Sequence, residues 1–322
     1  MKAVIITEDK NLRWSEVADP VMAAGEVLVE IHASGVNRAD LMQRVGNYPP
    51  PPGCPDWPGL EVSGIIKAIS EEAKSESNMQ VGDKVCALLG GGGYAEYVSV
   101  HHSMLMPVPD GVSMIEAAAL PEAFAAGYLN LFMEGGGKYG DTLLMHAGAS
   151  GLASVIIPMA KAFGIRVITS VLTAEIAEKI KHLNADVVID TSVQDVVEVL
   201  KKESVNIVID CLGGEKTGEC FNHVEYGCRW IIIAALAGEL TTVNLRTLYM
   251  KNIRLIGSTL RSKPLQIKAE ILARLVSEVW PKVSSGEVRP TVYKTFPIEQ
   301  AIEAHKLLED GKSIGKVVLI VK

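Results

Sequence analysis

The region from residue 142 to residue 260 alternates short apolar runs with amphipathic helical stretches, and no other feature constrains the fold as strongly. The apolar runs are residues 142–145, 166–171, 186–190, 205–212, 229–236 and 253–260. Apolar runs that alternate with helical patterns are typical of βαβ units, in which helices join parallel strands and cover the sheet. We therefore predict an α/β fold in which the six runs form a doubly wound parallel sheet.

The first hundred-odd residues follow a different pattern, in which β-rich runs are separated by turn residues. These runs are 2–7, 26–34, 61–70, 83–89 and 94–100. Short strands at this spacing predict an all-β barrel or sandwich. Residues 48–59 contain too many prolines for a helix or a central strand, so we expect a stiff loop there. The polar, acidic stretch 70–80 is expected to be a solvated loop.

The tail of the chain is too short to form a domain of its own. It contains an amphipathic helical pattern at 264–280, a second at 298–310 and an apolar run at 316–321. A segment of roughly 55 residues buries too little surface to be stable alone. We therefore expect the tail to rejoin the N-terminal domain. This organisation gives a first part of one domain over 1–120, an inserted domain with the parallel sheet over 121–262, and the return over 263–322.

Composition excludes several classes of protein. The 322 residues correspond to about two domains. The net charge of −7 argues against binding to nucleic acid or anionic membranes through a basic surface. The most apolar run, 230–238, is shorter than the ~20 residues that span a bilayer, and residues 1–11 lack the apolar core of a signal peptide. The five scattered cysteines predict no disulfide framework. We expect a reduced, soluble, cytoplasmic protein.

The sequence HAGASGLAS at 146–154 lies where the first strand of the parallel sheet meets its helix. Small residues in such a turn let the backbone approach a pyrophosphate, which the free amides of the helix N-terminus then bind. A turn of this kind alone would indicate only tight packing. Because further βαβ units follow it, we interpret it as a dinucleotide site.

The end of the second strand indicates which nicotinamide cofactor is used. An NAD site usually places an acid there to bind the ribose 2′-hydroxyl. This chain instead has hydroxyl side chains, among them Ser170, and its first acid is Glu175 in the next helix. The missing negative charge favours NADP(H), with Ser170 and Lys179 as candidates on the adenosine ribose side. No Lys or Arg stands at the strand tip itself.

Six segments, at 34–53, 59–66, 82–98, 117–128, 256–262 and 314–319, carry a family resemblance. They include VNRADLMQR with PPPPG, GLEVSG and the late IGK. Together they resemble the zinc-free quinone oxidoreductases, the zeta-crystallin-like branch of the medium-chain dehydrogenase/reductase superfamily. The resemblance implies a GroES-like β-barrel domain, an inserted Rossmann domain and a cleft between them. It also implies reduction of quinones or activated alkenes by NADPH, and assembly into homodimers or tetramers.

A zinc site is not expected. Zinc-dependent relatives carry Gly-His-Glu where this chain has Gly59-Leu60-Glu61, and they have a four-cysteine lobe that is missing here. Catalytic zinc needs about three protein ligands. The adjacent His101 and His102 are predicted to point to opposite faces of a strand. Without a Lewis acid we favour an acceptor that takes hydride readily, such as a quinone or an enone.

The family motifs imply a set of site residues in this sequence. Asn37 and Asp40 would lie nearest the nicotinamide, and Tyr48 would be the active-site tyrosine, with Arg44 bracing the loop. Tyr48 and Trp57 are candidates for the substrate pocket. The cofactor contacts would be Gly148, Ser150, Gly151, Leu152, Ser170, Lys179, Cys211, Gly213, Ala234, Ala235, Leu236, Ser258, Leu260, Gly315 and Lys316.

Three residues depart from the family pattern. Ala153 stands where the family usually has glycine, and Ala126 replaces a threonine near the nicotinamide, which removes a hydrogen bond of roughly 0.5–1.5 kcal/mol. Trp57 replaces a small aliphatic residue and either lines the pocket or only fills the core. Two other functions compete with quinone reduction. One is reduction of α,β-unsaturated carbonyls or enoyl thioesters, and the other is a nonenzymatic structural or RNA-binding role.

Overall fold

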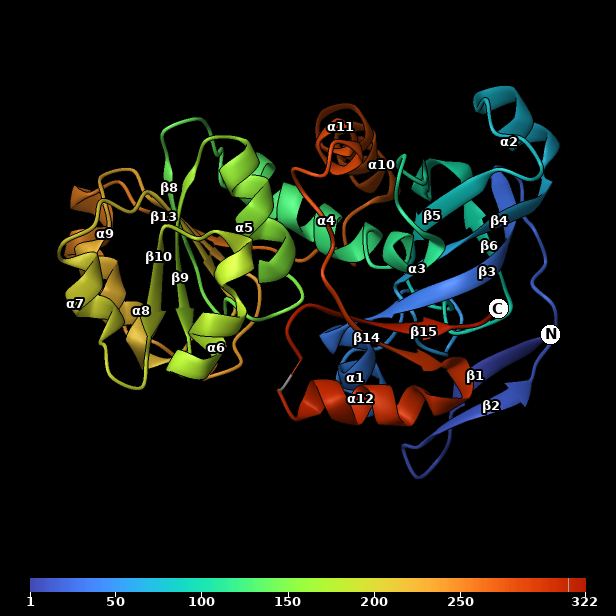
Figure 1. Cartoon of the computed structure of the whole chain (residues 1–322), viewed down its shortest axis with the longest axis horizontal. Coiled ribbons are helices and arrows are strands. Elements are labelled where there is room, and N and C mark those ends of the chain that lie inside the picture. Colours follow the sequence, from blue (N-terminus) through green and yellow to red (C-terminus); the bar gives the residue numbers. More distant parts are fainter. Residues whose placement is uncertain (312) are drawn as a thin grey trace. The chain divides into compact units, whose positions relative to one another are not determined.

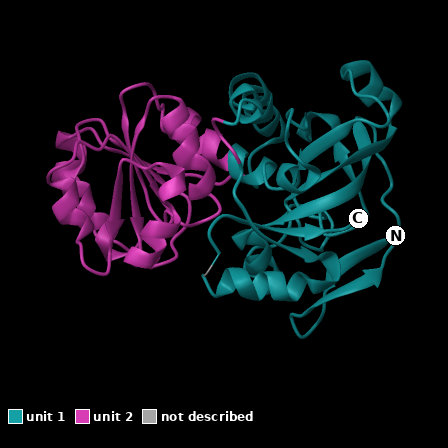
Figure 2. Cartoon of the chain, in the orientation of Figure 1, with its two compact units in different colours: residues 1–125, 261–286, 290–322 teal, residues 126–260, 287–289 magenta. Residues whose placement is uncertain are grey.

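The computed structural model describes residues 1–311 and 313–322 (Figure 1). The chain divides into two compact units (Figure 2). Unit 1 consists of residues 1–125, 261–286 and 290–322, and unit 2 of residues 126–260 and 287–289. Unit 2 is therefore an insertion in the sequence of unit 1. The predicted domain limits, after residues 120 and 262, lie close to these boundaries.

Unit 1 is built mainly on antiparallel strands, and the tail of the chain adds two strands, which pair with each other in parallel. Its strands are β1 (Lys2–Ile6), β2 (Leu12–Glu16), β3 (Glu26–Val36), β4 (Glu61–Ile69), β5 (Lys84–Leu88), β6 (Tyr97–His101), β7 (Leu105–Pro107), β14 (Val292–Pro297) and β15 (Lys316–Ile320). The main sheet has the order β14-β15-β3-β4-β5-β7, and β6 also pairs with β3. Val318 of β15 lies opposite Gly35 of β3 in an antiparallel ladder. The tail thus rejoins the N-terminal strands, as the sequence predicts.

The helices of unit 1 include several short ones that the sequence pattern did not reveal. The helices are α1 (Arg38–Arg44), α2 (Glu71–Glu76), α3 (Met114–Ala117), α4 (Pro121–Tyr128, which continues into unit 2), α10 (Leu265–Arg274), α11 (Trp280–Ser284) and α12 (Ala301–Glu309). The prediction of a loop over 70–80 is wrong, because α2 lies there. Ser70 caps it by accepting a hydrogen bond from the Ala73 amide, and buried Ala73 attaches the helix to the core. Residues 48–59 contain no helix or strand, as predicted.

Unit 2 is a six-stranded parallel sheet with helices between the strands. Its strands are β8 (Thr142–Met145), β9 (Arg166–Val171), β10 (Val187–Asp190), β11 (Ile207–Asp210), β12 (Arg229–Ile232) and β13 (Arg254–Gly257). The strand order β10-β9-β8-β11-β12-β13 confirms the predicted doubly wound sheet. The order reverses between β8 and β11, and ligands bind at such a switch point, beyond the carboxyl ends of the strands.

The helices of unit 2 are α5 (Ala153–Ala162), α6 (Ala174–Lys179), α7 (Val196–Leu200), α8 (Glu215–Cys220) and α9 (Leu245–Met250). Leu144, Ile168 and Val208 come from three neighbouring strands and are fully buried in one cluster. Trp230 stacks on Phe221 in the same cluster, with ring centroids 4.6 Å apart. This core fixes the sheet whose carboxyl edge carries the predicted cofactor residues.

Candidate active site

Asn37 and Asp40 lie at the junction of β3 and α1. Asn37 is the N-cap residue of α1, and its backbone amide donates a hydrogen bond to Asp40 Oδ2 (2.8 Å). Asp40 Oδ1 accepts a second one from the Gly59 amide (2.9 Å). Asp40 is fully buried, and burial raises the pKa of its carboxyl to about 6. This carboxyl therefore connects the start of α1 to the loop that precedes β4.

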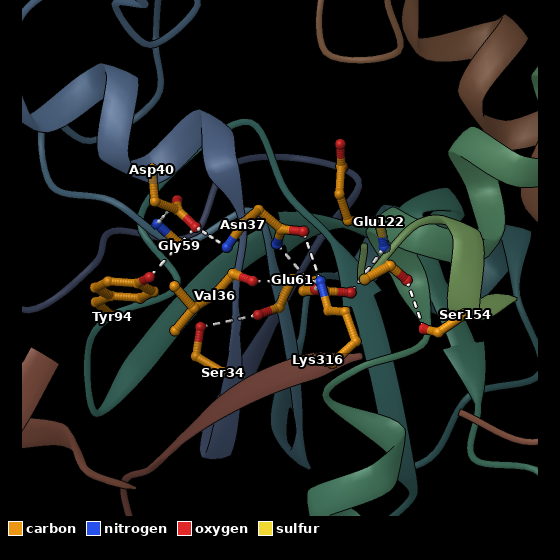
Figure 3. Close-up of polar contacts among 11 residues, drawn as sticks. Ser34, Val36, Asn37, Asp40, Gly59, Glu61, Tyr94, Glu122, Ser154 and Lys316 are labelled. Atoms are coloured by element: carbon orange, nitrogen blue, oxygen red, sulfur yellow. Dashed lines mark hydrogen bonds and ion pairs between the residues drawn. The ribbon is translucent and has the colours of Figure 1, made fainter. Parts of the chain in front are cut away.

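A buried ion pair orients the Asn37 side chain (Figure 3). Lys316 Nζ lies 2.6 Å from Glu61 Oε1, and the two side chains are 3% and 0% exposed. Asn37 bridges them, because its Nδ2 donates to Glu61 Oε1 (2.9 Å) while its Oδ1 accepts from Lys316 Nζ (2.6 Å). The anion attracts the amide nitrogen and the cation attracts the amide oxygen. Only one orientation of the Asn37 amide satisfies both.

Glu61 also holds the first turn of α4. Its Oε2 accepts a hydrogen bond from the Glu122 amide (2.9 Å), and its carbonyl accepts one from Ser34 Oγ (2.9 Å). Glu122 is partly buried, and burial together with the negative charge of Glu61 raises the pKa of the Glu122 carboxyl to about 8. At neutral pH Glu122 therefore carries a proton. Glu61 is not among the predicted site residues, although an acid within the apolar run GLEVSGII was a signal for it.

Two predicted cofactor residues, Gly315 and Lys316, lie at the start of β15. The Lys316 ammonium binds Glu61, Asn37 and the Val36 carbonyl (3.4 Å) inside unit 1. Gly315 has φ +100°, and a Cβ there would lie 2.4 Å from the Thr291 carbonyl oxygen. Glycine is therefore required before β15. The structure places Lys316 beside Asn37, as a residue that orients the Asn37 side chain.

Tyr94 and His305 extend this polar cluster into the core. The Tyr94 hydroxyl lies 3.3 Å from Asp40 Oδ2 and 3.2 Å from His305 Nε2. Burial, reinforced by the nearby Arg44 cation, lowers the pKa of His305 to about 3, so its ring is neutral. Arg44 forms an ion pair with Glu309. That ion pair connects α1 to α12.

The proline-rich loop carries Tyr48 and Trp57, which are both half-buried. Trp57 is held against the glycine loop 90–93, because its Nε1 donates to the Gly92 carbonyl and its own carbonyl accepts from the Gly92 amide (both 3.0 Å). Gly92 has φ +91°, and a Cβ there would lie 2.9 Å from Pro55. The Trp57 indole is therefore fixed by its nitrogen. Burial raises the pKa of the Tyr48 phenol.

Unit 2 contains a pocket of about 530 Å³ beyond the carboxyl ends of its central strands. His146 follows β8, Ser170 lies in β9, and Leu212 and Gly213 follow β11. Lys216 of α8 also lines it. Two of the predicted cofactor residues, Ser170 and Gly213, are thus brought together in one cavity.

The glycine turn adopts the predicted position between β8 and α5. The Gly148 amide donates to the Ser170 carbonyl (2.8 Å), and a Cβ on Gly148 would lie 2.4 Å from Thr169 Oγ1. Ser150 Oγ accepts from the Ala153 amide (3.1 Å), while Ser150, Gly151 and Leu152 remain partly exposed. Ala153 is fully buried, so its methyl group fits the close contact between helix and strand.

The side chains predicted on the adenosine ribose side already have partners. Ser170 Oγ lies 2.9 Å from His146 Nδ1. Lys179 Nζ pairs with Glu175 at 2.6 Å near the end of α6. Lys216, which the sequence analysis did not single out, pairs with Asp195 (3.1 Å) and Glu219 (2.7 Å). Lys179 and Lys216 therefore both form ion pairs with carboxylates.

The remaining cofactor candidates lie on loops after β11, β12 and β13. Asp210 shapes the first of these loops, because its Oδ1 accepts from the Leu212 and Gly213 amides (2.8 and 3.0 Å). A Cβ on Gly213 would lie 3.3 Å from Ala235, so these two loops pack together. The buried Ser258 Oγ has no hydrogen-bond partner among the described residues. The candidates on the three loops are Cys211, Gly213, Ala234, Ala235, Leu236, Ser258 and Leu260.

Comparison with known proteins identifies the family. Residues 23–110 match the alcohol dehydrogenase GroES-like domain, and residues 183–319 match the zinc-binding dehydrogenase family. The quinone oxidoreductase of Mus musculus is 26% identical over 320 residues, which span 95% of this chain and 92% of that protein. The chain belongs to the medium-chain dehydrogenase/reductase superfamily.

Two further proteins are similar to this chain, one in sequence and one in structure. The synaptic vesicle membrane protein VAT-1 homolog of Danio rerio is 30% identical over 319 residues, which span 93% of this chain but only 65% of that protein's length. The quinone oxidoreductase of Thermus thermophilus, whose crystal structures include a complex with NADPH, superposes with a TM-score of 0.84. Its identity to this chain is 28%, and each chain is covered completely.

The superfamily includes zinc enzymes, so the positions of possible metal ligands are informative. Within residues 1–311 and 313–322, no group of three or more His, Cys, Asp or Glu side chains is arranged to hold a metal ion. Leu60, at the position of the zinc-binding histidine, is buried. The prediction that His101 and His102 point to opposite faces of one strand is wrong. β6 ends at His101, and the centroids of the two imidazole rings lie 4.5 Å apart. His102 pairs with Glu76, and His101 with Ser103.

No helix within the described part of the chain combines the length and the apolar character needed to cross a membrane.

Proposed function

We propose that this protein is an NADPH-dependent, zinc-independent reductase that transfers a hydride to quinones. The observation that carries the proposal is the carboxyl edge of the unit 2 sheet, where a glycine turn and a pocket of about 530 Å³ meet at the strand-order reversal. Relatives named as quinone oxidoreductases, some solved with NADPH, support the same cofactor and acceptor.

The residues present fit such a cofactor. Gly148 lets the turn pack closely on β9, because a Cβ there would collide with Thr169, and Ser150, Gly151 and Leu152 stay partly exposed at the start of α5, where a pyrophosphate would bind. Gly148, Ser150, Gly151 and Leu152 would hold the pyrophosphate, with Ser170 and Lys179 on the adenosine ribose side. Cys211, Gly213, Ala234, Ala235, Leu236, Ser258 and Leu260 would line the nicotinamide side, where the Ser258 Oγ offers a hydrogen bond. When bound, NADPH supplies the hydride.

Unit 1 supplies the acceptor side in this proposal. Asn37 presents an amide whose orientation is fixed by Glu61 and Lys316. Asp40 holds the Asn37 backbone, and Tyr48 and Trp57 supply aromatic surfaces that suit a planar quinone. Gly315 and Lys316 complete this side by fixing the start of β15 beside Asn37.

The test is NADPH oxidation with a panel of ortho- and para-quinones, repeated with NADH, an enone and an enoyl-CoA. We expect quinone-dependent turnover that prefers NADPH. Preferential turnover of the enone or the enoyl thioester would move the function to the alternative acceptor class. Preference for NADH would contradict the NADPH assignment. A Tyr48→Phe variant and a surface variant, Arg13→Gln, provide the matched pair, because only Tyr48 belongs to the proposed site.

We also propose a homo-oligomer that forms through the β13 edge of unit 2. β13 is the last strand in the order of its sheet, and Leu255 on it is 45% exposed. Leu240, Leu245 and Met250 nearby in the sequence are 86%, 70% and 60% exposed. A strand edge beside exposed apolar side chains suits pairing with a second copy.

A cytoplasmic location is part of the proposal and fits five free cysteines.

A further inference from the structure

Arg261 is a buried arginine that connects three separate segments of unit 1. It is 6% exposed. Its Nε and Nη2 both donate to the Gly90 carbonyl (2.8 and 2.6 Å), and its Nη1 donates to the Tyr48 carbonyl (3.1 Å). Its Nη2 also donates to Gln43 Oε1 (2.7 Å). One side chain thus joins the glycine loop, the proline-rich loop and α1.

Arg261 adds to a small set of hydrogen bonds that hold the proline-rich loop, residues 48–59, against its neighbours. The proline-rich loop contains no helix or strand, so its shape depends on contacts with its neighbours. Gln43 adds one such contact, because its Nε2 donates to the Asp56 carbonyl (2.8 Å). The planar guanidinium presents several donors in a rigid fork, which a lysine ammonium cannot reproduce. Arg261 therefore sets the position of Tyr48 relative to α1.

Across residues 1–311 and 313–322, the positive charge of Arg261 is not neutralised by an ion pair. The guanidinium instead contacts two backbone carbonyls, one amide oxygen and an aromatic ring. The guanidinium carbon lies 4.9 Å from the centroid of the Tyr48 ring. The charge also acts on Tyr48, Cys54 and Glu122, where it opposes the rise in pKa that burial causes.

We propose that Arg261 is the positioning residue of the acceptor site and selects acceptors that become anionic on reduction. The inference rests on the proposed function, since it takes Tyr48 to face the acceptor. When a quinone accepts a hydride, the electron pair enters the ring, one oxygen becomes an anion, and a proton from water completes the hydroquinone. A buried cation behind Tyr48 stabilises that anion through the low-dielectric interior.

The test compares Arg261→Gln, which removes the charge and the fork, with Arg261→Lys, which keeps only the charge. Arg13→Gln is the control, because Arg13 is exposed and its Nε donates to the Ser15 hydroxyl (3.2 Å), away from this network. We expect R261Q to lower kcat/KM for the quinone about tenfold, as for the loss of one charge-assisted interaction in the transition state, with the Kd for NADPH unchanged. R261K should recover part of the quinone kcat/KM. Amide hydrogen exchange over residues 47–58 should be faster in both variants.

Four results decide between the possible roles. Unchanged exchange over 47–58 in R261Q would overturn the positioning role, whatever the substrate is. Equal quinone kcat/KM values for R261K and R261Q would overturn the role of the charge. Equal losses of NADPH and quinone binding would show a general structural role and also overturn the proposal. If the wild type reduces no quinone, the proposed function fails, and the selection of anionic acceptors fails with it. In that case, faster amide hydrogen exchange over residues 47–58 in R261Q but not in R13Q would support the positioning role alone.

Discussion

Glu61 and Lys316 form an ion pair that is removed from water almost completely. Each charge loses its hydration on burial, and the pair is tolerated because the partners lie 2.6 Å apart and further donors satisfy the carboxylate. Removal of one partner leaves the other charge buried and alone. The ion pair therefore matters for the free energy of unfolding mainly because removing one partner is costly.

We predict that Glu61→Gln or Lys316→Met alone lowers the free energy of unfolding by about 3–5 kcal/mol. The double variant should be destabilised by less than the sum of the two, because no buried charge is left unpaired. Urea denaturation of the four proteins in a double-mutant cycle measures this. Additive effects would show that the two charges do not stabilise each other.

Glu122 gives a prediction about pH. Its pKa is about 8 in the folded protein and near its ordinary value of 4.5 when unfolded, because burial and Glu61 disfavour the anion. Between these values the folded state binds a proton that the unfolded state has released, so stability falls as the pH rises from 4.5 to 8. Lys316 and Arg261 oppose this effect and Asp40 adds to it.

Glu122→Gln removes this titration and keeps the shape of the side chain. We expect the free energy of unfolding of E122Q, relative to the wild type, to increase steadily from pH 4.5 to pH 8. Urea denaturation at both ends of this range measures the difference. Asp40 titrates in both proteins and cancels. A difference that is constant with pH would mean that Glu122 is ionised throughout.

At the scale of the structural elements, the turn between β8 and α5 depends strongly on a single residue, Gly148. Gly148 touches Thr169 so closely that any side chain must push β9 away or move the turn. The turn also receives its shape from Ala147, which adopts φ +55°. The helix N-terminus is thus positioned by contacts with the sheet and not by the helix sequence alone.

We predict that Gly148→Ala weakens NADPH binding about tenfold, since the new methyl group must displace the turn from the phosphate. Gly148→Ala with Thr169→Ala should recover part of the affinity, because the second change removes the colliding hydroxyl and methyl groups. Isothermal titration of NADPH into both variants and into T169A alone measures this. The idea fails if G148A, folded by circular dichroism, binds NADPH like the wild type.

At the scale of the whole molecule, the β13 edge makes the assembly state testable. Leu255→Lys places a charge on the strand that we propose pairs with a second copy, and buried unpaired charge disfavours association. We expect L255K to be a monomer by sedimentation while keeping its secondary structure. Val21→Lys is the matched control, since Val21 is 91% exposed in unit 1. An oligomer that persists in L255K would place the interface elsewhere.

Periodicity in the sequence predicted the overall fold but not the contacts that complete the site. The six parallel strands of unit 2 follow from local patterns, because each has its own apolar run. Helices α1 and α2 are too short to show a period. The bonds of Glu61 to Lys316 and of Arg261 to Tyr48 join residues far apart in the chain. No local pattern encodes such distant pairs, so the motifs indicated Asn37, Tyr48 and Lys316 but not Glu61 and Arg261, which bond to them.

The insertion of unit 2 into the sequence of unit 1 imposes an order on biosynthesis. A nascent chain leaves the ribosome with its N-terminus first, and domains tend to fold as they emerge. All of residues 126–260 are synthesised before β15, which is the neighbour of β3. Until residue 316 emerges, Glu61 lacks its cation and β3 keeps an open edge. We therefore expect unit 2 to fold during translation. Unit 1 should remain a partly folded, chaperone-dependent intermediate until residue 316 has emerged.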